Sequence, residues 1–188
     1  MQITTELAVK VLSIVDAGLV SGVGNPIPGQ MCIEAAICYA LGEPHGDKPS
    51  CVSPPVRAAK IQLNDAAWSR PEARAKGMRK IAIAQLGSAG NINEQAFVAY
   101  LVEGVIRQIV PRALRSAISM HPDQKHKDAM EAAAKQCEAD GDKKAANASN
   151  AASRSKIDAK SGGNGMAAVL ATKAFTSACF ANGNTACA

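Results

Sequence analysis

The segment 30–41 constrains the fold more than any other part of the chain. It reads QMCIEAAICYAL, and a helix built from it is apolar on every side except at Glu34. Such a helix has no face suited to water, so other elements must enclose it. We therefore predict a buried central helix near residues 30–41, with Gly42 placed just past its end.

The composition favours helices as the enclosing elements. Apolar residues make up 47% of the 188 residues, yet aromatic residues make up only 3%, so Ala and aliphatic side chains dominate. Alanine has the highest helix propensity, whereas strands prefer β-branched and aromatic residues. The chain is long enough to bury one sizeable core. We expect an all-α fold, a single-domain bundle of about seven to nine helices.

Apolar spacing and capping residues place the other helices. They are expected over residues 5–20, 53–67, 69–86, 93–109, 111–120, 122–140 and 166–179. Ser69 and Glu72 form the pattern of a capping box, and Asn93 is a suitable N-cap. Pro111 should kink or restart the helix that it interrupts.

Composition also suggests a division of the chain. Residues 1–140 form the predicted helical core domain, and residues 141–188 form an extension rich in Ala, Asn and Ser. The extension has helix propensity but few large apolar residues. Its first part is either an Ala-packed outer helix or partly disordered. We expect the extension as a whole to be helical and docked on the core, with a frayed tail.

Positive charge is concentrated in the middle of the chain. The net charge is +5, and residues 52–115 contain ten cationic and four acidic side chains. This bias permits an acidic protein, a phosphate-bearing ligand or nucleic acid as partner. Trp68 is the one tryptophan near these residues and no helix-turn-helix is evident, which disfavours nucleic acid. The candidate ligand-binding cations are Arg57, Lys60, Arg74, Lys76, Arg79 and Lys80.

Glu34 is a further candidate because it is the one charged group of the central helix. A buried carboxylate without a partner is very costly. Glu34 must therefore reach solvent, remain protonated, or pair with a cation such as Arg57, Arg74 or Arg79. A structural ion pair is favoured over a catalytic acid.

The cysteines offer two kinds of chemistry. Cys38, His45 and Cys51 could converge on a metal, but their spacing is unlike that of structural zinc sites, and we predict no metal and no cofactor. Cys32 could be a nucleophile at a helix N-terminus, with His45 as base and Asp47 as its orienting group. The simpler interpretation is that the six cysteines are free thiols and small core residues.

The chain offers no segment of about 20 apolar residues and no secretory signal at its start. We therefore expect a cytoplasmic protein that does not enter a membrane.

Several stretches resemble one group of proteins. They are PGQMCIEAA from Pro28, ALGEPHGDKPSCV from Ala40, LNDAAWS from Leu63 and ARAKG from Ala73. These stretches are similar to those of small uncharacterised bacterial and phage helical proteins, and the likeness covers residues 18–115. The group carries no known activity, so the resemblance transfers no functional residue. It implies a prokaryotic or viral origin and, in a phage, a role in interplay with host defence.

Three functional hypotheses follow. The leading one is a non-enzymatic binding protein whose basic helices engage an acidic protein or an anionic small molecule. The second is a thiol-dependent enzyme using Cys32 and His45, and it is less favoured because no complete catalytic motif is present. The third is a structural or self-assembling component, which would form a homo-oligomer.

Overall fold

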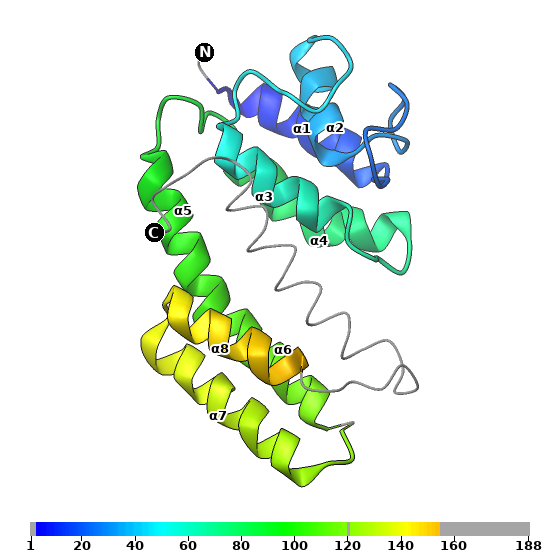
Figure 1. Ribbon diagram of the computed structural model, residues 1–188. Coiled ribbons are helices and arrows are strands. Elements are labelled where there is room, and N and C mark those ends of the chain that lie inside the picture. The colour runs from blue at the N-terminus through cyan, green and yellow to red at the C-terminus, as the bar shows by residue number, and fades with distance from the viewer. Residues whose placement is uncertain (1–2, 120, 155–188) are drawn as a thin grey trace. The chain divides into compact units, whose positions relative to one another are not determined.

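The computed structural model describes residues 3–119 and 121–154, and these residues form helices (Figure 1). The elements are α1 (Thr5–Asp16), α2 (Ile33–Leu41), α3 (Pro54–Asn64), α4 (Pro71–Ala84), α5 (Glu94–Gly104), the π-helical turn η1 (Val105–Ile109), α6 (Val110–Ile118), α7 (Gln124–Asp140) and α8 (Lys143–Arg154). The all-α prediction is confirmed. Between residues 3 and 154, no described helix is long and apolar enough to cross a membrane.

The chain forms two compact units, residues 1–94 and 95–188. Each has its own hydrophobic cluster, one centred on α1, α2 and α4 and the other on η1, α6, α7 and α8. The expected domain boundary at residue 140 falls inside the second unit. The predicted helix at 166–179 lies outside the described residues.

The central helix of the first unit is α2. Ile33, Ala35, Ala36 and Ile37 are completely buried, as the apolar run 30–41 predicts. The helix is three residues shorter at its start than expected, because Cys32 is the N-cap. Gly42 ends it with φ 73°, a left-handed conformation that glycine adopts without strain. Val11, Ile14 and Val15 of α1 and Met78 of α4 pack into the same cluster.

The predicted capping box at the start of α4 does not form. Pro71 is the first helical residue, so the N-cap position falls on Arg70 and not on Ser69. The fixed φ of proline suits the first helical position, and the residue before a proline is driven to extended backbone. Arg70 has φ −167° and ψ 162°, and no side chain caps the helix.

The segment 94–118 shows how the chain accommodates Pro111. Proline has no N–H to donate to the carbonyl four residues earlier, and its ring clashes with that carbonyl. Directly before it, η1 widens the helix by one residue, and the Val110 N–H donates to Val105 O. The expected interruption therefore takes the form of a π-helical turn between α5 and α6.

The helices α7 and α8 complete the second unit. Asp123 caps α7, and Gly141 ends it with φ 65°. Arg107 donates to the last carbonyls of α7, at 2.7 Å from Glu138 O and Ala139 O. In α8, Ala145 and Ala146 are buried against the cluster, so this start of the predicted extension is an alanine-packed helix.

Candidate functional site

Glu34 and Lys60 form a buried ion pair at the centre of the first unit. Glu34 is in the first turn of α2, and Lys60 is on the face of α3 that meets it. Lys60 Nζ lies 2.6 Å from Glu34 Oε1, and the two side chains are 3% and 0% exposed. The expected ion pair is present, but its cation is Lys60 and not Arg57, Arg74 or Arg79.

The pKa values of both partners shift in the direction that favours the uncharged form. Burial raises the pKa of Glu34 above its usual range, against the opposing attraction of Lys60 and Arg57. Burial likewise lowers the pKa of Lys60 to about 8, against the attraction of Glu34. Loss of hydration therefore outweighs the attraction within the pair.

The first unit holds several buried polar atoms that are poorly satisfied, including those of the pair. The Glu34 oxygens, Lys60 Nζ, Ser53 Oγ and the side-chain amide of Gln85 have no hydrogen bond of good geometry within the described part of the chain. Most buried polar groups in folded proteins are hydrogen-bonded, so each exception calls for a physical reason. All these atoms belong to the first unit.

Asn64, one turn beyond Lys60, is the best-connected side chain of this region. Its Oδ1 accepts from the Ile33 N–H at 3.3 Å, and its Nδ2 donates to Val20 O at 2.9 Å. Asn64 thus joins α3 to the start of α2 and to the loop before it. Sequence reasoning missed this residue, although the four-residue spacing from Lys60 places both on one helix face.

The structure does not join Cys32, His45 and Asp47 through any described contact. Cys32 is 5% exposed, and its Sγ accepts from the Ala35 N–H at 3.3 Å. Burial raises the pKa of this thiol. The His45 Nε2–H donates to Gly24 O at 2.9 Å, and Asp47 pairs with Arg57 at 2.9 Å.

The other cysteines of the first unit are also buried free thiols. Burial raises the pKa of Cys38 to about 11 and raises that of Cys51. Within residues 3–119 and 121–154, no group of three or more His, Cys, Asp or Glu side chains is placed to hold a metal ion.

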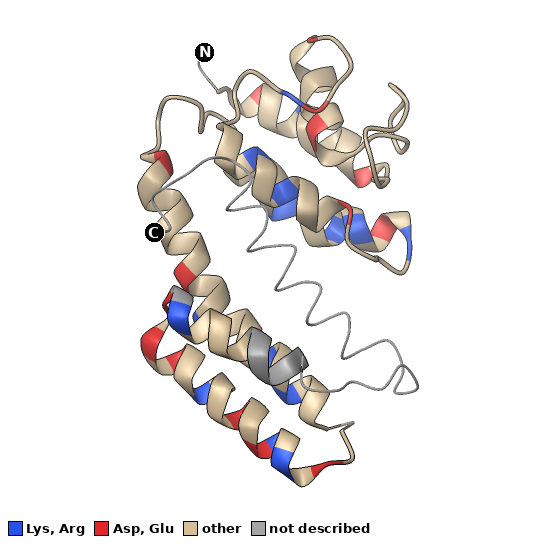
Figure 2. Ribbon diagram, viewed as in Figure 1, with Lys and Arg blue, Asp and Glu red and all other residues tan. Residues whose placement is uncertain are grey.

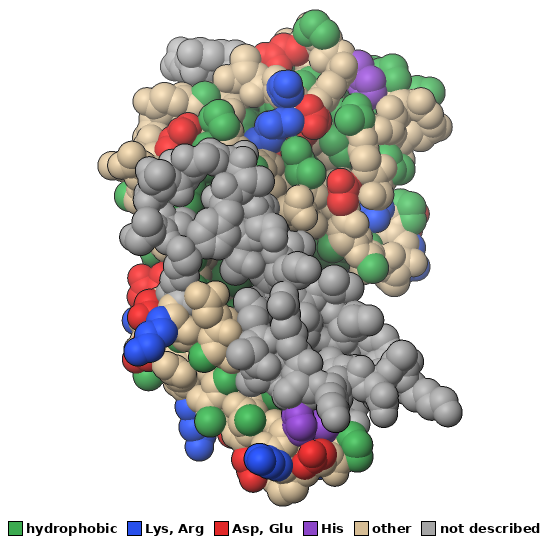
Figure 3. All heavy atoms as spheres, in the orientation of Figure 1, with side chains coloured by type: hydrophobic (Ala, Val, Ile, Leu, Met, Phe, Trp, Pro, Cys, Tyr) green, Lys and Arg blue, Asp and Glu red, His purple; other side chains and the backbone are tan. Residues whose placement is uncertain are grey.

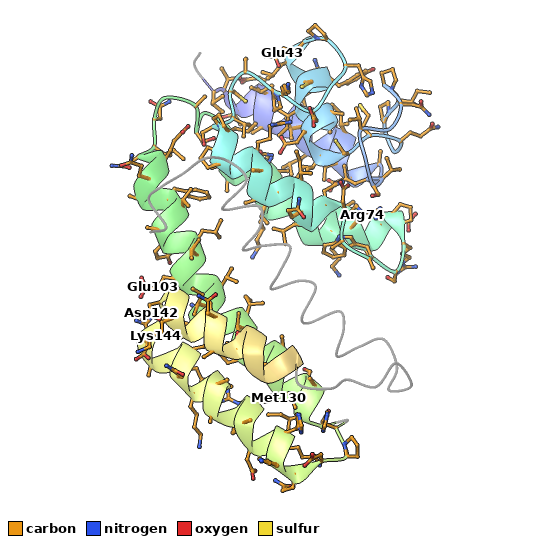
Figure 4. All side chains as sticks on the ribbon, in the orientation of Figure 1. Glu43, Arg74, Glu103, Met130, Asp142 and Lys144 are labelled. Carbon is orange, nitrogen blue, oxygen red and sulfur yellow. The ribbon has the colours of Figure 1, made fainter. Side chains whose placement is uncertain are left out.

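The predicted basic set divides into inward and outward residues. Figure 2 shows Lys and Arg positions in blue along α3 and α4. Lys60 is in the core. Arg74, labelled in Figure 4, donates to Asn64 O at 2.8 Å and to Leu19 O at 3.0 Å, so its guanidinium fastens backbone segments together. These two residues are therefore not part of an exposed cationic surface.

The remaining cations differ in their partners. Arg57 is partly exposed beside Asp47, and Arg79 pairs with Asp16 at 2.8 Å. On the face drawn in Figure 3, the cationic side chains of the first unit lie next to acidic ones. Lys76 and Lys80 are exposed on α4, and neither forms an ion pair with a residue that the structure describes.

The fold and the site define a class: an all-α protein whose first unit holds a buried Glu–Lys pair between α2 and α3 and exposes two lysines on α4. Comparison with protein-family models, with curated proteins and with solved structures finds no match.

Proposed function

We propose that this chain is a non-enzymatic binding protein that engages an acidic protein or a phosphate-bearing small ligand through α4. The observation that carries the proposal is the pair Lys76 and Lys80, both exposed and without an anionic partner among the described residues. Of the six cations predicted for binding, these two are the ones left for a ligand.

Helix geometry supports joint action of the two lysines. Residues four apart are neighbours on one helix face, with Cβ atoms about 5–6 Å apart. Two ammonium groups at this spacing offer several charge-assisted hydrogen bonds to phosphate or carboxylate oxygens. Trp68 lies against Gly77, the residue after Lys76, so an indole ring borders the same surface.

The buried state of Cys32 favours this proposal over the thiol-dependent enzyme. A nucleophilic thiol needs exposure and a lowered pKa. Cys32 is 5% exposed, and burial raises its pKa.

Binding can be tested with defined anions and one intrinsic probe. Trp68 is the single tryptophan of the chain, so its fluorescence reports on the α4 surface alone. The probes are inorganic tripolyphosphate for the phosphate class and poly-L-glutamate for the acidic-protein class, titrated at low and at physiological salt. We expect saturable binding of one of them, weakened by salt because the contacts are ionic.

A matched pair of variants identifies the surface. Lys76→Gln/Lys80→Gln should weaken binding at least tenfold, or about 1.4 kcal/mol. Lys48→Gln/Lys125→Gln removes the same charge from two other exposed lysines and should leave affinity within about twofold. Equal weakening in both double variants, or no saturable binding of either anion, would refute the proposal.

A further inference from the structure

The fully buried side chains of α3 are polar, whereas those of the other helices in the first unit are mostly apolar. Its buried residues are Lys60 and Asn64, whereas α1 buries Val11, Ile14 and Val15. Among the described residues, α3 contributes one hydrophobic side chain to the first cluster, the partly buried Val56. Undocking α3 would therefore expose much less apolar surface than undocking α1.

The polar contacts that hold α3 can be replaced by water. They are the Glu34–Lys60 pair, the Asn64 hydrogen bonds, the Arg57–Asp47 pair and two hydrogen bonds to carbonyls at the end of the helix, from Trp68 and Arg74. A hydrogen bond exchanged for one with water contributes little net stability. Segments with few buried apolar contacts are the ones that open locally.

Undocking also removes the free-energy cost of keeping the Glu34–Lys60 pair out of water. Glu34 and Lys60 would regain hydration, and so would Ser53 Oγ, which has no hydrogen bond of good geometry in the docked state. The other ionisable groups close enough to act on the pair are Arg57, Asp47, Cys32 and Cys51.

We propose that α3 is a releasable flap over α2, closed across the buried Glu34–Lys60 pair, which opens while α1, α2 and α4 stay packed. The mostly exposed turn at residues 65–70 is the hinge at the end of α3, and the hinge at its start lies directly after Ser53, whose N–H donates to Ser88 Oγ. Opening uncovers the side of α2 that carries Glu34 and gives solvent access to the thiols of Cys32 and Cys51. The flap thus controls exposure of an otherwise enclosed helix.

Thiol labelling of the full chain tests the flap. Under native conditions, with Cys179 and Cys187 replaced by Ser, Cys32 and Cys51 should react with a neutral alkylating reagent at least tenfold faster than global unfolding of the protein permits. Cys137, buried in the second unit, is the internal control and should react no faster than that unit unfolds. Peptide mass spectrometry resolves each site.

Two variants link opening to the ion pair. Lys60→Met leaves Glu34 without its cation, so labelling of Cys32 and Cys51 should accelerate at least tenfold. Glu34→Met/Lys60→Met replaces the pair with apolar side chains and should slow labelling below the wild-type rate. Labelling of the double variant at or above the wild-type rate would overturn the proposal.

Amide hydrogen exchange on the wild-type protein gives an independent result that needs no variant to fold. The amides of residues 57–64 should exchange at least tenfold faster than those in the middle of α1, α2 and α4. Uniform protection across these helices, with Cys32 and Cys51 labelled only at the global unfolding rate, would show that α3 does not open separately.

Discussion

At the scale of single residues, the Glu34–Lys60 pair sets the chemistry of the first unit. Two charges separated by 2.6 Å attract strongly, yet both pKa values move in the direction that burial dictates. Removing one partner of such a buried pair strongly destabilises the fold, whereas replacing both with apolar side chains often leaves its stability unchanged or higher. Its free energy is therefore best measured by a cycle of variants.

We expect Lys60→Met to lower the free energy of unfolding by about 3–5 kcal/mol, because an uncompensated carboxylate stays in the core. Glu34→Met/Lys60→Met should lie within about 1 kcal/mol of the wild type or be more stable. Urea unfolding followed by circular dichroism provides the measurement. A double variant as unstable as the single one would show that the pair stabilises the fold on balance.

The pH dependence of stability should carry the signature of both groups. The pKa of Glu34 is raised in the folded state, so its contribution is present at low pH and is lost as pH rises through the folded pKa. The pKa of Lys60 falls from 10.5 to about 8, so its contribution grows as pH rises between these values.

The apolar double variant is the reference, because it retains the cysteines, which titrate in the same alkaline range. Relative to Glu34→Met/Lys60→Met, the wild type should be least stable between the folded pKa of Glu34 and about pH 8. Its relative stability should then rise towards pH 10.5. A flat difference over the whole range would contradict the assigned directions.

At the scale of elements, the Trp68 ring, which precedes α4, packs closely against the backbone of that helix. Trp68 Nε1–H donates to Leu63 O at 2.9 Å, and the ring covers Gly77 so closely that a Cβ there would overlap it. Glycine is unfavourable inside a helix, so its presence in α4 is explained by this contact and not by backbone conformation.

We therefore expect Gly77→Ala to destabilise the protein by about 1–2 kcal/mol, despite the better helix propensity of alanine. The helical Gly104 is the control, because, apart from its chain neighbours and its own helix backbone, no atom of the described residues lies within 4 Å of its Cβ position. Gly104→Ala should be neutral or stabilise by up to about 1 kcal/mol. Thermal unfolding compares the two, and a stabilising Gly77→Ala would exclude the proposed overlap.

At the scale of the whole molecule, the described residues form two hydrophobic clusters, one in each unit. The cluster of residues 1–94 draws on α1, α2 and α4, and the cluster of the second unit draws on residues from Ile106 to Ala146. A unit with its own core can fold alone.

We expect residues 1–94, produced as a separate fragment, to keep helical circular dichroism and to unfold cooperatively with a free energy of about 5 kcal/mol or more. A matched fragment ending at residue 64 lacks α4 and should be largely unfolded, because Met78 and Ala82 complete the cluster. Loss of structure in the 1–94 fragment would mean that this unit depends on the rest of the chain.

The sequence predicts the helices better than it predicts which side chains pair with one another. The all-α class, the buried central helix, the Gly42 end and the Asp140–Gly141 boundary follow from spacing, propensity and capping residues, which act over a few residues along the chain. The capping-box prediction was wrong because Pro71, which lies between Ser69 and Glu72, is the first helical residue. The N-cap position therefore falls on Arg70 and not on Ser69.

The sequence by itself determined that one apolar helix must be enclosed, because apolar side chains are costly to leave in water. It also determined that Glu34 within that helix needs a cation, because a carboxylate is costly to remove from water. Only the tertiary structure decided that Lys60 meets that need, that Arg74 turns to backbone carbonyls and that Lys76 and Lys80 stay exposed. All four cations carry the same charge, and helix packing alone determines which face each one meets.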